Sequence, residues 1–401
     1  MRSRFCTLAA AAVTVIACTD VTPPVSPNVA LRDGGGPDVA NIVWADSVVR
    51  PTGPGSIYGL FMPVTWNGDV IYYAHGTRDV LEPVNLPSGI DSTTFVRDAL
   101  GALGFAIAYS SWSSNGFALE DAIRRTHQLQ GLFVSKYGRP DHSYLMGHSL
   151  GGLAALALAE RFPRQYDGAY LLCGLIAGSE FTFQNIGNVR LLFDFFYPGA
   201  LPGTVTTMPL SVLADPFGLV AGPALAAIQT NPTGALTMFQ IDQVTIEGNS
   251  LTEKIESLVR ILVGHSRFVN DVLPRVHGHF PFGNGNTEYT IGGSAAPLAA
   301  LNATIQRYHI SADADRWREH NYEPTGAIRF PVLTLHTNRD YFAPFLSEAL
   351  FAGKVAMAGA SDLLVQRTMN RWGHCTFSVQ EMVTGLMDLV NWVENGVKPT
   401  P

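Results

Sequence analysis

The sequence is poor in charge and in lysine. Only 15% of the 401 residues are charged, whereas about a quarter is usual in globular domains. Because 47% of the residues are hydrophobic, the composition excludes a largely disordered chain. Lysine supplies four of the 26 basic residues, and the net charge is −7. Phosphate binding needs a clustered basic face, so the composition argues against nucleic acid as a partner.

Cysteines and long apolar runs are also few. The four cysteines are Cys6, Cys18, Cys173 and Cys375, and none of them has the C-x-x-C spacing of a structural zinc site. No apolar run approaches the roughly 20 residues that a membrane-spanning helix needs. The length allows about two or three domains, or one domain with a large insertion.

The first 50 residues are expected to export and tether the protein. Residues 1–17 join a basic start to a short apolar stretch, as a secretory signal peptide does. Val15–Cys18 resembles the lipobox of bacterial lipoproteins, whose cysteine is lipidated and becomes the mature N-terminus; ordinary cleavage at the same bond is the alternative. Residues 18–50 contain Pro-Pro and Gly-Gly-Gly and are predicted to be a flexible tether. We therefore expect the protein to be anchored in the bacterial cell envelope through a lipid on Cys18, at the outer membrane where the cell has one. Secretion without an anchor is the alternative.

From residue 51 onward, apolar runs alternate with helical patterns. Short continuous apolar runs predict strands at 57–62, 70–74, 105–109, 144–146, 169–173, 331–335 and 363–369. Helical patterns are found at 91–101, 119–137, 150–162, 345–357 and 379–394. Apolar strands that alternate with helices indicate an α/β protein, with a mostly parallel sheet covered on both faces.

Predicted strands and helices do not alternate between residues 178 and 328. The stretch is too long for a loop, and it contains a helical pattern at 251–263. We interpret 178–328 as an inserted cap or lid domain, and 51–177 with 329–401 as the core. The aromatic run Phe193–Tyr197 is then either a wall of a lipophilic site or part of the core of the cap.

Ser149 lies in the motif Gly147–Gly151, which fits G-x-S-x-G, between a predicted strand and a helix of small residues. In a nucleophile elbow the glycines allow a sharp turn that presents the serine hydroxyl at a helix N-terminus. We interpret Ser149 as a nucleophile, and a glycine-rich turn without catalysis is the alternative. The amide of Leu150, the next residue, is expected to stabilise the oxyanion.

A serine nucleophile needs a general base, and the base needs an orienting carboxylate. His374 lies between the last predicted strand and the last helix, where the chain order Ser-Asp-His places the base. A histidine that caps the helix or fills a loop is the alternative. Asp340 is the only carboxylate in the loop after 331–335 and is the candidate acid. Glu180, which follows the preceding strand, is the reserve candidate.

Taken together, these motifs resemble those of the α/β-hydrolase superfamily, and secreted bacterial serine esterases and lipases in particular. The resemblance covers the chain from about residue 55 to the end and implies an α/β-hydrolase fold with the triad Ser149, Asp340 and His374. Esterases and lipases carry a His-Gly pair after the strand equivalent to 70–74, and the next residue donates an oxyanion amide. The resemblance therefore implies this role for Thr77, with His75 bracing the loop or serving the structure alone.

His374-Cys375 also resembles the tannase and feruloyl esterase family, in which a disulfide links the neighbours of the catalytic Ser and His. The residue before Ser149 is His148, so that disulfide cannot form here. Cys173 and Cys375 are both expected near the carboxyl edge of the sheet, in an oxidising compartment. A Cys173–Cys375 disulfide and a pair of buried thiols both remain open.

Three further residues, His75, Trp112 and Tyr341, are candidates for contact with substrate. For Trp112, which follows the strand 105–109, packing alone is the alternative. Two other sequence features are weak metal-site candidates. His277 and His279 lack an evident third ligand, and the pair Asp313 and Asp315 lacks the glycine and glutamate of a calcium loop, so no metal and no cofactor are expected.

The expected chemistry is hydrolysis of carboxylic esters through an acyl-enzyme, with a small-molecule or polymeric ester as the partner. An apolar and aromatic cap suits acyl or aryl groups, and no obvious acidic cluster is present to hold a substrate amine. A secreted peptidase or aminopeptidase of the same fold is the alternative, and a non-catalytic lipoprotein on a hydrolase scaffold is a third possibility. Acyl chain length, natural substrate and oligomeric state do not follow from the sequence.

Overall fold

The computed structural model describes residues 42–87, 92–292 and 298–401. The predicted signal peptide, the lipidation site Cys18 and the predicted tether up to residue 41 lie outside the described residues. Among the helices that are described, none is both long and apolar enough to cross a membrane.

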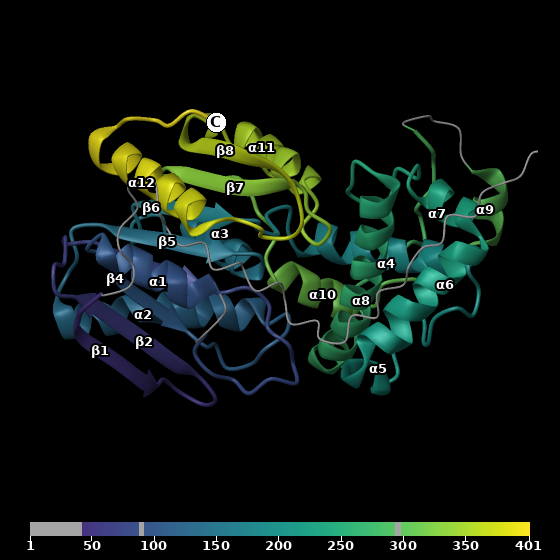
Figure 1. Cartoon of the computed structure of the whole chain (residues 1–401), viewed down its shortest axis with the longest axis horizontal. Helices are drawn as coiled ribbons and strands as arrows, with labels where there is room; N and C mark the ends of the chain where they lie inside the picture. Colours follow the sequence, from purple (N-terminus) through teal and green to yellow (C-terminus); the bar gives the residue numbers. More distant parts are fainter. Residues whose placement is uncertain (1–41, 88–91, 293–297) are drawn as a thin grey trace, which may run out of the picture. The chain divides into compact units, whose positions relative to one another are not determined.

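An eight-stranded sheet organises the chain (Figure 1). The strands are β1 (Trp44–Pro51), β2 (Ile57–Pro63), β3 (Val70–Ala74), β4 (Ala106–Ser110), β5 (Ser143–His148), β6 (Gly168–Leu172), β7 (Val332–Arg339) and β8 (Leu364–Trp372). Their order is β1-β2-β4-β3-β5-β6-β7-β8. The pairs β1–β2 and β2–β4 are antiparallel, and every later pair is parallel. The carboxyl ends of β3 to β8 therefore meet at one edge of the sheet.

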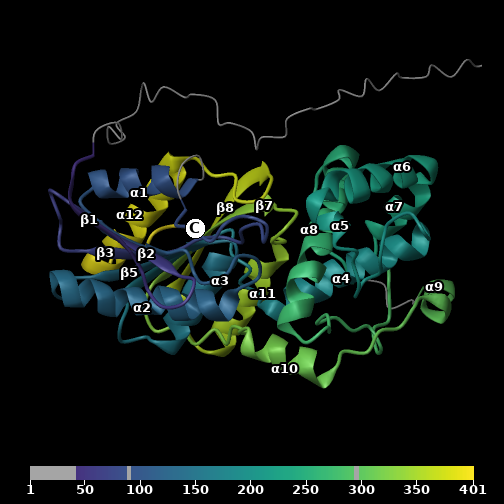
Figure 2. The same ribbon diagram turned by 90° about the horizontal axis from the view of Figure 1, so that it is seen from below.

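Helices cover both faces of this sheet, as Figure 2 shows. On one face lie α1 (Ser92–Ala102) and α12 (Val379–Asn395), and on the other α2 (Leu119–Tyr137), α3 (Leu150–Arg161) and α11 (Leu346–Met357). Alternate side chains of one strand enter different cores: Tyr72 packs under α2, whereas Ile71 and Tyr73 face the other core. Because both faces are covered, the central strands are apolar throughout, which is the pattern that the sequence analysis used.

Residues 179–328, between β6 and β7, form a helical insertion. Its elements are α4 (Ser179–Phe196), α5 (Ser211–Ala214), the π-helix η2 (Phe217–Ala221), α6 (Gly222–Thr230), α7 (Pro232–Met238), α8 (Leu251–Arg275), α9 (Ala299–Thr304) and α10 (Ala312–His320). Phe193 and Tyr197 are buried with ring centroids 4.6 Å apart, so these aromatic residues belong to the core of the insertion.

Helix α8 is longer than the predicted 251–263, because it continues through Gly264 to Arg275. Glycine inside a helix costs about 1 kcal/mol relative to alanine. Here the missing side chain makes room for a neighbour, since a Cβ at Gly264 would stand 2.8 Å from the ring of Phe342. Packing against the loop after β7 therefore explains why the helix does not end at this glycine.

The tether predicted over residues 18–50 is wrong from Trp44 onward. Trp44–Pro51 form the edge strand β1, which pairs antiparallel with β2. Trp44 packs on one core, where it meets Phe61 edge to face at 5.6 Å, and Val48 packs on the other. The polar residues Asp46 and Ser47 lie between them, so the segment lacks the continuous apolar run by which the other strands were predicted.

Candidate active site

Ser149 occupies a sharp turn between β5 and α3. Its backbone has φ 54° and ψ −124°, in a region that a residue with a side chain rarely adopts and that costs on the order of 1–3 kcal/mol. Gly147 and Gly151 allow the turn: a Cβ on Gly147 would collide with the carbonyl of Gly151, and one on Gly151 with the carbonyls of Ala74 and His75. The first turn of α3 thus lies directly against the end of β3, with the serine between them.

The three residues predicted to form a triad lie in hydrogen-bonding contact. His374 Nε2 is 2.9 Å from Ser149 Oγ, and His374 Nδ1 is 2.7 Å from Asp340 Oδ2. Since a carboxylate only accepts hydrogen bonds, Nδ1 carries a proton and Nε2 is left to accept one from the serine. This arrangement can deprotonate the Ser149 hydroxyl and stabilise the imidazolium that results.

Asp340 is fully buried in the turn after β7. Its Oδ1 accepts hydrogen bonds from the backbone amides of Phe342, at 2.8 Å, and Ala343, at 3.0 Å, which fix the carboxylate plane. The reserve candidate Glu180 is elsewhere: its carboxylate is exposed and pairs with Arg318 at 3.3 Å. The structure therefore leaves Asp340 as the carboxylate that contacts His374.

The chain order of these residues matches their places in the sheet. Ser149 follows β5, Asp340 follows β7 and His374 follows β8, all at the carboxyl edge of the parallel strands. A strand–serine–helix elbow with the acid and the histidine in this order is the arrangement of the α/β-hydrolases. The fold is that of the α/β-hydrolases.

Leu150 and Thr77, the predicted oxyanion residues, both border Ser149. Leu150 is the first residue of α3, so its amide belongs to the turn that has no acceptor within the helix. The loop after β3 crosses the elbow, since a Cβ at Gly76 would lie 3.3 Å from Ser149 Cβ, and Thr77 lines the same cavity as the serine. The role of the two amides stays a prediction.

His75 and Trp112, two of the three residues predicted to contact substrate, do not reach the cavity beside Ser149. Both side chains are buried, and neither lines the cavity at Ser149. Their rings stack with centroids 3.6 Å apart, and His75 Nδ1 donates to the carbonyl of Gly76 at 2.6 Å. Burial lowers the pKa of His75 to about 4, so the ring is neutral near pH 7. The stacked rings of His75 and Trp112 therefore stabilise the loop that carries Thr77.

A cavity of about 300 Å³ lies beside Ser149 and His374. Tyr341, the third predicted substrate contact, lines it, and the rest of its wall is largely apolar. Helix α8 supplies much of this wall, which the sequence analysis did not predict. The apolar members are Val80, Phe217, Val259, Val263, Phe268 and Phe342. The i, i+4 spacing of the valines on α8 is the signal that could have revealed this face.

The charged residues at the cavity are paired with one another or with neighbours. Arg267 Nη2 is 3.3 Å from Asp79 Oδ2, and Asp271 binds Arg275 at 2.7 Å. The second oxygen of Asp271 accepts a hydrogen bond from the amide of Phe117. Both carboxylates that line the cavity are therefore already neutralised by arginines, which leaves no free anion to hold a substrate amine.

Helix α8 is bound to both loops that carry the acid and the histidine. Beside Asp340, Arg339 pairs with Glu253 at 3.3 Å, and Phe342 packs on Phe268 with centroids 5.5 Å apart. Beside His374, the indole of Trp372 donates to Ser257 Oγ at 3.0 Å. The insertion thus contacts the core directly beside Asp340 and His374.

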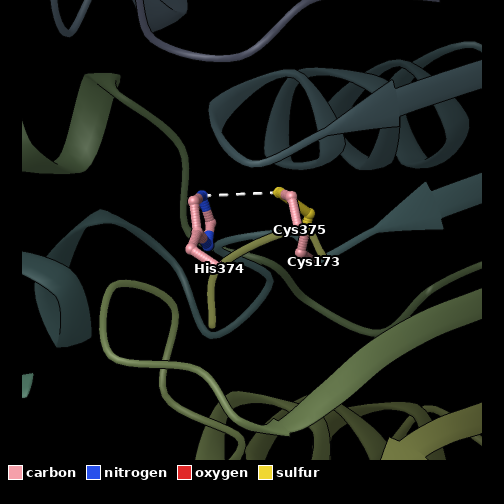
Figure 3. A group of neighbouring side chains, drawn as sticks. All are labelled: Cys173, His374 and Cys375. Carbon is pink, nitrogen blue, oxygen red and sulfur yellow. Dashed lines mark hydrogen bonds between the residues drawn. A yellow bond between two sulfur atoms is a disulfide. The ribbon is translucent and has the colours of Figure 1, made fainter. Parts of the chain in front are cut away.

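Cys173 and Cys375 form a disulfide, with Cα atoms 5.3 Å apart. It joins the end of β6 to the residue after His374, and Cys375 Sγ is 3.5 Å from His374 Nε2 (Figure 3). Cys173, His374 and Cys375 are close enough to ligate a metal, but the disulfide leaves no thiolate for this. Behind them, His148 hydrogen bonds with the Tyr73 hydroxyl, and burial lowers the pKa of His148 to about 3.

Of the two weak metal-site candidates, the pair Asp313 and Asp315 forms ion pairs, and the structure shows no role for the pair His277 and His279. Asp313 and Asp315 lie in the first turn of α10 and pair with Arg316 and Arg318. In the described part of the chain, neither this pair nor His277 with His279 belongs to a group of three possible ligands.

No family model and no curated protein sequence matches the chain. Solved structures with a similar arrangement include an esterase from Aspergillus oryzae, 14% identical, with 88% of this chain and 80% of that chain covered and a TM-score of 0.47. Tannin acyl hydrolase from Aspergillus niger is 13% identical over 90% of this chain and 83% of its own, with a TM-score of 0.46. Candida Antarctica lipase A is 13% identical, with 86% of this chain and 75% of that chain covered and a TM-score of 0.44. Likeness at this level carries no information about substrate.

Proposed function

We propose that the protein is a serine hydrolase that cleaves carboxylic esters through an acyl-enzyme intermediate. The observation that carries the proposal is the continuous hydrogen-bonded chain Ser149–His374–Asp340 at the wall of a largely apolar cavity. A serine hydroxyl is a weak nucleophile until a neighbouring base takes its proton, and here the base is itself oriented by a buried carboxylate.

In the proposed reaction, Ser149 Oγ attacks the ester carbonyl carbon while His374 Nε2 takes the hydroxyl proton. The negative charge on the carbonyl oxygen is held by the amides of Leu150 and Thr77. The imidazolium, stabilised by Asp340, then gives its proton to the departing alcohol oxygen. A water molecule, deprotonated by the same histidine, attacks the acyl-enzyme, and the acid leaves as the proton returns to Ser149.

The lining of the cavity favours an ester over a peptide. Its apolar wall suits an acyl or aryl group, and its two carboxylates, Asp79 and Asp271, are occupied by arginines. A secreted peptidase with the same triad is the second candidate. Initial rates on an aminoacyl p-nitroanilide separate the two, since a serine peptidase cleaves activated esters as well but only a peptidase would also cleave the amide.

The experiment that tests the proposal is a series of p-nitrophenyl esters, from acetate to palmitate, with the chain from residue 19 onward. Ser149→Ala should lower kcat by about ten thousandfold or more. Ser361→Ala, at an exposed serine before β8, is the matched control and should retain wild-type rates. A wild type that hydrolyses no ester, or a Ser149→Ala variant that keeps its activity, would show the proposal to be wrong.

We also propose that the chain is exported and anchored through a lipid on Cys18. The support is the basic and apolar sequence of residues 1–17 and its lipobox-like end. Metabolic labelling of the full chain with radioactive palmitate should label the wild type and leave Cys18→Ser unlabelled. An unlabelled wild type in the medium would favour ordinary secretion instead.

A further inference from the structure

A buried histidine lies directly behind the catalytic acid. His336, on β7, is 0% exposed, and its Nε2 is 3.6 Å from Asp340 Oδ2. On the other side of the ring, Nδ1 is 3.6 Å from Glu348 Oε1. Neither ring nitrogen makes a hydrogen bond with any described residue, and these two carboxylates face them at ion-pair distance. The imidazole is therefore held between two buried acidic side chains.

Glu348, the carboxylate that faces Nδ1 of His336, is fixed in place by hydrogen bonds to its other oxygen. It lies on α11, is 4% exposed, and its Oε2 accepts hydrogen bonds from Thr334 Oγ1 at 2.6 Å and from Gln366 Nε2 at 2.5 Å. These donors come from β7 and β8, so the carboxylate is fixed to the strands. Its second oxygen is left to face His336, while burial raises the pKa of the carboxyl.

The donor and acceptor chemistry assigns the protons of this cluster. Asp340 Oδ2 already accepts from His374 and can only accept, so His336 Nε2 carries a proton that points at it. The other ring nitrogen, Nδ1, faces Glu348 Oε1 at 3.6 Å. Buried charges are stable only when compensated, and a second proton on this ring would compensate one of the two carboxylates.

We propose that His336 and Glu348 are positioning residues for the hydrolysis, and that they extend the triad to Ser149–His374–Asp340–His336–Glu348. His336 keeps Asp340 oriented and reduces the negative charge that it presents to His374. Glu348 keeps the second proton on His336. The inference rests on the proposed function, because it concerns the basicity of the same histidine.

Other ionisable groups act on Asp340 from the elements around it. Glu247, which precedes α8, and Tyr341 interact with its charge, and His374 does so by direct contact. On the remaining side, the ring of Phe345 lies 5.9 Å from that of His336. Since Glu247 and Tyr341 are retained in the variants below, a change in pH dependence would come from the His336–Glu348 pair.

The test compares the pH profiles of kcat/KM for wild type and Glu348→Gln. Without the carboxylate, the second proton leaves His336, and Asp340 presents its full charge to His374. The acid limb of the profile is then expected to move to higher pH by about one to two units, from a unit charge acting at about 6 to 10 Å in an effective dielectric near 20. We expect kcat to fall about tenfold and KM to change less than about twofold, since the substrate cavity is untouched.

Glu323→Gln is the matched control, because Glu323 is another carboxylate whose pKa is raised by burial, but it binds the amide of Glu180, away from the triad. Its profile should equal that of the wild type. His336→Gln keeps a donor near Nε2 without an ionisable ring, and it serves as the second variant where Glu348→Gln does not fold. The double variant should match the worse single variant, because the two residues act through one chain.

The outcomes separate this inference from the proposed function. A wild type without esterase activity contradicts both. An active wild type whose acid limb is unmoved in Glu348→Gln and His336→Gln contradicts the positioning role alone. A loss of kcat with an unchanged acid limb, or additive losses in the double variant, also overturns it, because both describe a merely structural effect.

Discussion

Removing the Cys173–Cys375 disulfide is expected to lower the free energy of unfolding by several kcal/mol. The two cysteines are 202 residues apart in the sequence. In the chain-entropy model, a cross-link of that span removes about 5 kcal/mol of loop-closure entropy from the unfolded chain at 25 °C. Residual structure in the unfolded chain reduces this figure, so about 5 kcal/mol is the upper end.

Urea unfolding of the variant Cys173→Ala/Cys375→Ala, followed by tryptophan fluorescence and by circular dichroism, measures this loss. Coincident transitions in the two signals establish that a single free energy is defined. The chain should start at residue 19, which removes the other two cysteines. We also expect kcat to fall, because the disulfide fixes the backbone next to His374, and wild type in reducing buffer should approach the variant in both respects.

Two results would refute this reasoning. One is a variant whose unfolding free energy lies within about 1 kcal/mol of the wild-type value, which would mean that the cross-link does not constrain the unfolded chain as the model assumes. The other is titration of two free thiols in unfolded, unreduced wild type, which would mean that the bond does not form.

Three further changes test other parts of the site. Asp340→Asn should lower kcat by about 10⁴, because an amide no longer holds His374 in the productive tautomer; stopped-time ester assays at pH 7 measure this, and a loss under tenfold would contradict it. Burial raises the pKa of Glu323 to about 7, above its unfolded value, so it contributes stability below about pH 4.5 that is lost as pH rises through 7. Glu323→Gln should therefore flatten the fall in unfolding free energy between pH 4.5 and 8, and an unchanged slope would contradict this. Val263→Trp should fill part of the cavity and move the p-nitrophenyl ester optimum to shorter chains by raising KM for long ones, whereas an unchanged optimum would place the acyl group elsewhere.

The sequence was enough to predict the sheet from β2 to β8 and the residues that meet at its carboxyl edge. The strands are short, continuous apolar runs, and the turns after β5, β7 and β8 carry Ser149, Asp340 and His374 within a few residues of the strand end. Parallel strands bring such turns together whatever fills the space between them. Local pattern and sheet geometry therefore suffice to bring Ser149, Asp340 and His374 together, and their catalytic role is proposed above.

The residues that sequence reasoning missed depend on contacts between distant segments. The predicted strand 331–335 stops short of His336, whereas β7 continues to Arg339, and the carboxylate that faces His336 comes from α11. The stack of His75 on Trp112 turns both rings away from the cavity, which their positions after strands do not reveal. To predict that α8 lines the cavity, one would have to know which face of the helix packs against Phe342.

The contacts between α8 and the segments at Asp340 and His374 have a consequence for the proposed hydrolase. The helix that lines the cavity also contacts the two segments that carry Asp340 and His374. A sequence change that widens or narrows the cavity through α8 should therefore alter kcat together with substrate range. Changing the size of the cavity without changing kcat would then require substitutions outside α8, such as at Val80 in the loop after β3.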